Sequence, residues 1–185
     1  MYFETEGPGN TEETIRIAVQ EGRERQISHI VVASNSGKTA EALAEEAEKR
    51  GYPGQLVCVT HVYGFREKGT NELGDEGRRA LEARGVKVYT ASHVLSGAER
   101  GLSRKFHGVY PVEIIAHTLR IFGQGVKVSV EIAVMALDGG LIPYGVPVIG
   151  IGGTGGGADT AVILIPAHAG AILETRVREV LCKPK

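Results

Sequence analysis

The feature that most restricts the fold of this chain is an alternation of short apolar runs with helix-like stretches over its first 90 residues. The apolar runs are rich in β-branched residues, whereas the stretches between them carry apolar residues at helical spacing. Strands are expected at residues 27–33, 55–60 and 86–90, and helices at residues 10–25, 38–50 and 72–84. Alternation of this kind predicts a parallel sheet with right-handed crossovers.

The second half of the chain has a different pattern. Residues 91–110 look irregular or weakly helical, and residues 126–137 are apolar on nearly every side, which predicts a buried helix. The other expected elements are a helix at 111–122, strands at 146–151 and 160–166, and an edge strand or short helix at 176–181. The simplest account is one domain over residues 1–185. We expect an α/β fold of three layers, with a mostly parallel sheet of five or six strands and helices on both faces.

The loop between the first strand and the helix that follows it carries the clearest chemical signal. Its sequence is S-N-S-G-K-T, formed by Ser34, Asn35, Ser36, Gly37, Lys38 and Thr39. Ligands of open parallel sheets bind at the carboxyl ends of the strands, where this loop lies. A helix N-terminus offers unpaired N–H groups and the positive end of a dipole, and the loop adds hydroxyls and an ammonium group. We therefore predict that the loop binds the phosphate of a small ligand.

The same loop is not a Walker A motif. That motif has the form G-x-x-x-x-G-K-S/T, and Val32 stands where its first glycine is required. ATP hydrolysis is therefore not predicted. The alternative interpretation is that Ser36 only caps a helix and Lys38 is solvated.

A second candidate is the glycine-rich stretch at residues 150–159. Gly150, Gly152 and Gly155 fit G-x-G-x-x-G, but a dinucleotide-binding motif must open a helix, and here a strand follows. The stretch is better interpreted as bare backbone that closes over a ligand. Its expected contacts are Gly152, Gly153, Thr154, Gly155 and Asp159, the last as a hydrogen-bond acceptor. A flexible connection in which Asp159 is a turn residue explains the same pattern.

A third candidate follows the second strand, at the same edge of the sheet. Here Thr60, His61, Gly64 and Phe65 are expected near the ligand, with His61 as a polar contact and Tyr63 or Phe65 as a stacking ring. Ordinary packing of aromatic residues in a loop is the alternative. Two charges on the apolar helix, Lys127 and Glu131, and the nearby Asp138 are interpreted either as partnered structural charges or as polar groups that line the pocket.

Composition excludes several classes of function. The net charge is −1, from 21 basic and 22 acidic residues, and tryptophan is absent, which disfavours a nucleic-acid surface. The histidines have no metal-ligand spacing and no G-x-S-x-G elbow is present, so neither a metal site nor an esterase triad is predicted. Cys58 and Cys182 are expected to be free thiols. With no apolar run of about 18 residues and no signal peptide, a cytoplasmic location without membrane contact is expected.

Residues 10–61 resemble the C-terminal α/β domain of pyruvate kinase, where a helix, a strand, a T-x-S-G-R/K-S/T loop and a helix follow in this order. In that family the loop binds a phosphate of a sugar-phosphate effector. Pyruvate kinase chemistry belongs to a (β/α)₈ barrel of about 200 residues or more, which does not fit here, so no kinase activity is expected. The resemblance implies a stand-alone version of this domain.

The chain also resembles a small, largely archaeal group of proteins with this fold. The shared strings are S-N-S-G-K-T-A, V-T-H-x-x-G-F and G-G-T-G-G-G-A-D-T-A. That resemblance implies bound flavin mononucleotide (FMN) and assigns no enzymatic role or catalytic residue. The alternative is a regulatory module that senses a sugar phosphate or similar metabolite without catalysis. Apolar residues in the helices at 111–122 and 126–137 also suggest a homo-oligomer.

Overall fold

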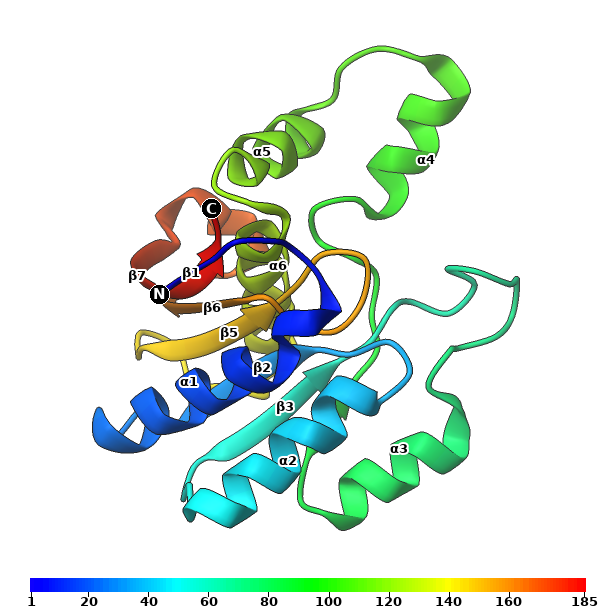
Figure 1. Cartoon of the computed structure of the whole chain (residues 1–185). Helices are drawn as coiled ribbons and strands as arrows, with labels where there is room; N and C mark the ends of the chain where they lie inside the picture. The colour runs from blue at the N-terminus through cyan, green and yellow to red at the C-terminus, as the bar shows by residue number, and fades with distance from the viewer.

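A computed structural model describes residues 1–185 and contains one seven-stranded sheet with the strand order β1-β7-β6-β5-β2-β3-β4 (Figure 1). The α-helices are α1 (Thr11–Glu24), α2 (Lys38–Arg50), α3 (Gly74–Ala83), α4 (Gly97–Phe106), α5 (Pro111–Arg120) and α6 (Gln124–Asp138). The strands are β1 (Tyr2–Phe3), β2 (His29–Ala33), β3 (Gln55–Val59), β4 (Lys87–Tyr89), β5 (Val148–Gly152), β6 (Thr160–Ile165) and β7 (Arg176–Pro184). Two 3-10 helices, η1 (Pro8–Asn10) and η2 (Ala169–Glu174), complete the chain.

The predicted α/β fold with a mostly parallel sheet is confirmed. The strand pairs β2–β3, β3–β4, β2–β5 and β1–β7 are parallel, while β5–β6 and β6–β7 are antiparallel. The number of strands is seven instead of the expected five or six, because β1 consists of only Tyr2 and Phe3 and pairs with the end of β7. Two residues are too few to produce a periodic pattern. The segment expected to be an edge strand or short helix is the strand β7.

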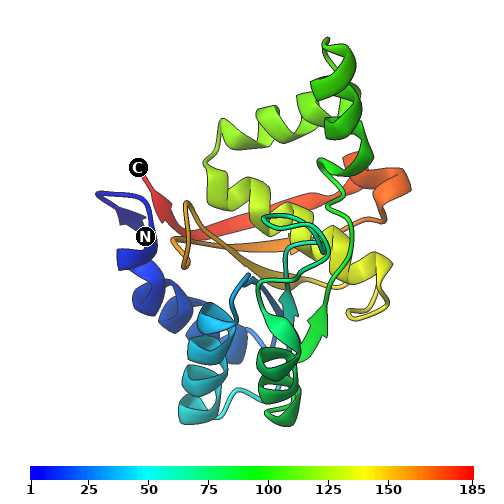
Figure 2. The ribbon, with the colours of Figure 1, turned by 90° about the vertical axis from the view of Figure 1, so that its right-hand side faces the viewer.

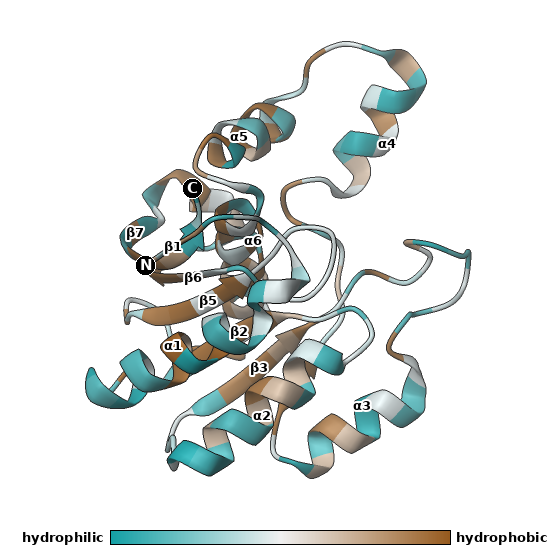
Figure 3. Ribbon diagram, in the orientation of Figure 1, coloured by the Kyte–Doolittle hydropathy of each residue, from teal (hydrophilic) through white to brown (hydrophobic).

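The sheet lies between two helical layers because its strands bury both faces. Ile30 and Val32 of β2 pack in one core with residues of α1, α2 and α3, whereas Val31, between them, packs in a second core with residues of α6. Successive side chains of a strand point to opposite faces, so a continuous apolar run serves both cores. Figure 2 shows α1, α2 and α3 on one side of the sheet and α6 on the other, and Figure 3 shows the hydrophobic residues concentrated along the strands.

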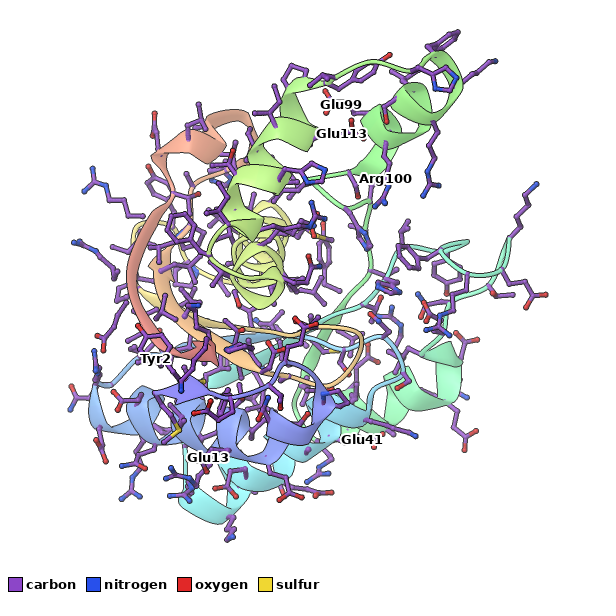
Figure 4. All side chains as sticks on the ribbon, turned by 45° about the horizontal axis from the view of Figure 1, so that its top comes forward. Tyr2, Glu13, Glu41, Glu99, Arg100 and Glu113 are labelled. Atoms are coloured by element: carbon purple, nitrogen blue, oxygen red, sulfur yellow. The ribbon has the colours of Figure 1, made fainter.

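Helices α4 and α5 project from the body of the molecule (Figure 1). The weakly helical segment expected at residues 91–110 contains α4, which has no buried residue. Two hydrogen bonds join the pair: the Val112 N–H donates to Glu99 at 2.8 Å, and the Ser103 hydroxyl donates to Glu113 at 2.7 Å. Figure 4 shows Glu99, Arg100 and Glu113 together at this end of the molecule.

Helix α6 is the predicted buried helix, with 12 of its 15 residues buried. It crosses the sheet beneath α5, and its N-terminal turn lies against the end of β5. A Cβ atom on Gly152 would lie only 2.3 Å from the Gly125 carbonyl oxygen, so this approach requires glycine. None of the helices combines the length and apolar character needed to cross a membrane.

Candidate functional site

The three loops singled out from the sequence meet around one cavity of about 760 Å³. Figure 1 shows the loops after β2 and β3, and the loop between β5 and β6, on the same side of the molecule, where β2 and β3 end. The predicted residues that line the cavity are Ser34, Asn35, Ser36, Thr39, Thr60, His61, Phe65, Gly153 and Gly155. The predicted residues outside its lining are Gly37, Lys38, Gly64, Gly152, Thr154 and Asp159.

The loop after β2 is shaped by its own residues. The Ser34 N–H donates to the Val59 carbonyl at 3.1 Å, and the Ser34 hydroxyl accepts the Ala40 N–H of the first turn of α2 at 3.3 Å. Gly37 has a φ of +91°, and a Cβ atom there would lie 2.9 Å from Leu73 Cδ1. Gly37 therefore allows the turn, and Ser34 fixes the start of the helix, so neither is expected to be the main ligand contact.

Three side chains of this loop have no hydrogen-bond partner within the protein and line the cavity: Asn35, Ser36 and Thr39. Thr39 is only 7% exposed, so little of this lining residue meets bulk solvent. They lie at the N-terminus of α2, whose first N–H groups lack acceptors within the helix. The loop thus offers hydroxyl, amide and backbone donors to an anion.

The charge that the sequence led us to expect at the cavity, that of Lys38, lies away from it in this structure. Its side chain is exposed, lies outside the lining and makes no ion pair. Neighbouring positions of a helix are rotated by about 100° from each other, so Thr39 faces the cavity while Lys38 faces solvent. Glu41, in the same turn (Figure 4), is also outside the lining.

Aromatic rings form the part of the cavity that follows β3. The rings of His61 and Phe65 stack with their centroids 3.7 Å apart, and His93 lies 5.4 Å and 5.5 Å from them. Burial lowers the pKa of His93, although the nearby carboxylate of Glu131 opposes this shift. Tyr63 is 55% exposed and outside the lining, so of the two candidate stacking rings, Tyr63 and Phe65, only Phe65 lies at the cavity.

The wall contributed by α6 contains a buried ion pair. Lys127 and Glu131 are each 6% exposed, line the cavity and bind each other, and Glu131 also accepts the Leu95 N–H at 2.9 Å. Burial lowers the pKa of Lys127, while Glu131 acts in the opposite direction. Both interpretations of these charges therefore hold, because they are partnered and also face the cavity. Asp138 is outside this cavity and accepts a hydrogen bond from His168.

The glycine-rich loop between β5 and β6 is held in place by hydrogen bonds to the N-terminal segment. Gly155, Gly156 and Gly157 all have positive φ angles. The Thr11 hydroxyl accepts the Ala158 N–H at 3.0 Å, and Asp159 accepts the Gly7 N–H at 2.9 Å and the Thr160 hydroxyl at 2.7 Å. Asp159 is fully buried. Asp159, expected as a hydrogen-bond acceptor for a ligand, lies outside the cavity lining, and both of its oxygens accept hydrogen bonds from protein groups that anchor the N-terminal segment.

Sequence reasoning missed several lining residues: Arg66, Glu72, His93, Ser96, Arg100, Arg120 and Gln124. Arg100 and Arg120 come from α4 and α5, and the guanidinium of Arg100, unlike that of Arg120, has no hydrogen-bond or ion-pair partner. Arginines on amphipathic helices are common on protein surfaces, so no local pattern distinguishes these two. No group of three or more His, Cys, Asp or Glu side chains is arranged to hold a metal ion.

Comparison with known proteins gives one family match. The family described as "Pyruvate kinase, alpha/beta domain" matches residues 12–164. Among solved structures, a pyruvate kinase from Cryptosporidium parvum is similar, with 16% identity and a TM-score of 0.45 over 83% of this chain and 22% of that chain. A second structure of a pyruvate kinase from that organism gives 14% identity and a TM-score of 0.40, covering 94% and 23%. A third, in complex with ADP, gives 15% and 0.41, covering 91% and 23%. The chain spans less than a quarter of the length of these enzymes.

Proposed function

Because the chain belongs to the pyruvate kinase alpha/beta domain family, as residues 10–61 suggested, we propose that it binds a phosphorylated small ligand, flavin mononucleotide, in the cavity at the ends of β2 and β3. The phosphate would bind at residues 34–39. The observation that carries the proposal is the group of unpartnered donors at the N-terminus of α2, above all the Thr39 hydroxyl, which is 7% exposed and lines the cavity.

The remainder of the cavity suits a flavin. Its volume of about 760 Å³ lies in the ordinary range for small-ligand sites. Stacked His61 and Phe65 offer a flat aromatic surface for a ring system. The backbone of Gly153 and Gly155 and the side chain of Gln124 are polar groups within the lining that suit the hydroxyls of a ribityl chain. A bound flavin would supply electron-transfer chemistry, and the protein would position it and exclude water.

The proposal does not include phosphoryl transfer. The loop at residues 34–39 lacks the first glycine of a Walker A motif, since Val32 occupies that position as a fully buried residue of β2.

Purified protein tests the proposal directly. We expect mass spectrometry under native conditions to detect FMN with freshly purified protein, and absorption spectra to show a flavin. If the protein is colourless, FMN added to it should raise its melting temperature. A protein that carries no flavin and whose melting temperature does not respond to FMN would contradict the proposal. Reduction of the bound flavin by NADH or NADPH would then distinguish an enzyme from a carrier.

A sugar phosphate is a second candidate ligand, and the arginines of the cavity favour it. Arg66, Arg100 and Arg120 line the cavity beyond the phosphate loop, and guanidinium groups bind additional anionic oxygens well. Under this alternative the chain is a regulatory module without catalysis. A sugar bisphosphate would then raise the melting temperature more than FMN does at equal concentration.

A further inference from the structure

The two histidines in the cavity differ in which ring nitrogen is left without a hydrogen bond. His93 is engaged through Nε2, which accepts the Val62 N–H at 3.4 Å, and Lys127 and Glu131 bind each other. His61 has a carboxylate partner at Nδ1, whereas its Nε2 atom has no hydrogen bond within the protein. Because His61 lines the cavity, this nitrogen is available to a bound molecule.

The contacts of Glu72 determine which nitrogen of His61 carries the proton in the neutral ring. Glu72 Oε2 lies 2.6 Å from His61 Nδ1, and its other oxygen, Oε1, lies 2.9 Å from Nε of Arg66. A carboxylate that pairs with a guanidinium through one oxygen offers its other oxygen as a hydrogen-bond acceptor. Nδ1 must therefore donate, which leaves a lone pair on Nε2. Stacking on Phe65 restricts the tilt of the ring.

We propose that His61 Nε2 is a hydrogen-bond acceptor that selects ligands with an N–H donor on their ring system, and that Glu72 is the positioning residue that makes it one. This inference rests on the proposed function. If the ligand is oxidised FMN, the group that His61 Nε2 recognises is N3–H, because this is the single ring N–H of the isoalloxazine. A ligand without an N–H donor at this position leaves the half-buried His61 Nε2 unpaired, which weakens binding.

The test compares FMN with 3-methyl-FMN, which lacks that N–H, by fluorescence titration at about pH 8, where imidazole is normally neutral. Wild-type protein is expected to bind FMN about tenfold more tightly than 3-methyl-FMN. His61→Phe keeps an aromatic ring against Phe65 but has no acceptor, so this preference should disappear. His168→Phe is the matched control: His168 also binds a carboxylate, Asp138, at 2.7 Å but lies outside the cavity, so the preference should remain tenfold.

Equal affinities of the wild type for the two flavins, or an unchanged preference in His61→Phe, overturn the inference. If His61→Phe fails to fold, Glu72→Gln replaces it, because an amide can donate to Nδ1 and move the proton to Nε2. NMR of the ¹⁵N-labelled histidines should show the Nδ1–H form of His61 in the wild type; the Nε2–H form would refute the inference without any ligand. If FMN itself does not bind, the proposed function fails and the inference fails with it.

Discussion

The two glycine-containing loops of the cavity are fixed in different ways. The loop at residues 34–39 is ordered by the strand before it, the helix after it and its own Ser34 hydroxyl. The loop at residues 153–157 lies between two antiparallel strands and is fixed at its base by Gly7 and Thr11, which lie 152 and 147 residues before their partners in the chain. The first loop is thus a local structure, whereas the second depends on a tertiary contact.

This difference predicts which substitutions affect ligand binding alone and which affect stability as well. Changes at Ser36 and Thr39 of the first loop should remove phosphate contacts while leaving the fold intact, because these lining side chains, unlike that of Ser34, make no hydrogen bonds within the protein. Changes at the base of the second loop should weaken the fold and the site together, because the same hydrogen bonds anchor the N-terminal segment. Four predictions test this separation.

The largest expected effect is on stability, at Gly157. A Cβ atom there would lie 2.3 Å from the Thr11 hydroxyl and 2.9 Å from Pro8 Cα, at a φ of +60°. Gly157→Ala should therefore lower the free energy of unfolding by about 3 kcal/mol, from left-handed strain and overpacking combined. Gly155→Ala is the matched control, since its φ is +71° but no atom lies within 4 Å, and about 1 kcal/mol is expected. Equal losses in urea titrations would show that the N-terminal segment does not restrain the loop.

The largest expected effect on affinity is in the first loop. Ser36→Ala combined with Thr39→Val removes two hydroxyls that have no protein partner, and each hydrogen bond to a phosphate is worth roughly 1.5–3 kcal/mol. FMN should bind about 100-fold more weakly, with almost no change in melting temperature in the absence of ligand. A variant that binds FMN normally would show that the phosphate does not lie at this loop.

A smaller effect is expected at Thr11. Its hydroxyl donates to the Pro8 carbonyl at 2.7 Å and accepts the Ala158 N–H at 3.0 Å. Thr11→Val keeps the shape and removes both hydrogen bonds, so stability should fall by about 1–2 kcal/mol. Because the glycine loop loses an anchor, FMN affinity should fall about fivefold, measured by titration well below the melting temperature. Loss of stability with unchanged affinity would show that the loop does not contact the ligand.

The smallest effect is expected at Lys38. Its ammonium is exposed and outside the cavity lining, so its attraction for a bound phosphate is screened by water. Lys38→Ala should change FMN affinity by less than about threefold. A loss comparable to that of the Ser36 and Thr39 double variant would mean that Lys38 turns toward the phosphate when a ligand binds.

The sequence predicted the fold better than the site, for a physical reason. Strands β2 and β3 are buried on both faces, so their continuous apolar runs follow from burial alone. Likewise, local chain order places Thr39 and His61 after these strands, at one edge of the sheet. The bonds of Asp159 to Gly7 and the position of Arg100 depend on segments far away in the sequence, and no local pattern carries that information.

The phosphate of the ligand is proposed to bind at residues 34–39. Titration of the flavin-free protein with FMN and with riboflavin, which has the same ring and ribityl chain without the phosphate, tests it most directly. Wild-type protein is expected to bind FMN about 100-fold more tightly than riboflavin, whereas the Ser36 and Thr39 double variant should bind the two almost equally. Equal affinities of the wild type for both flavins, or a preference for FMN that survives in the double variant, would contradict it.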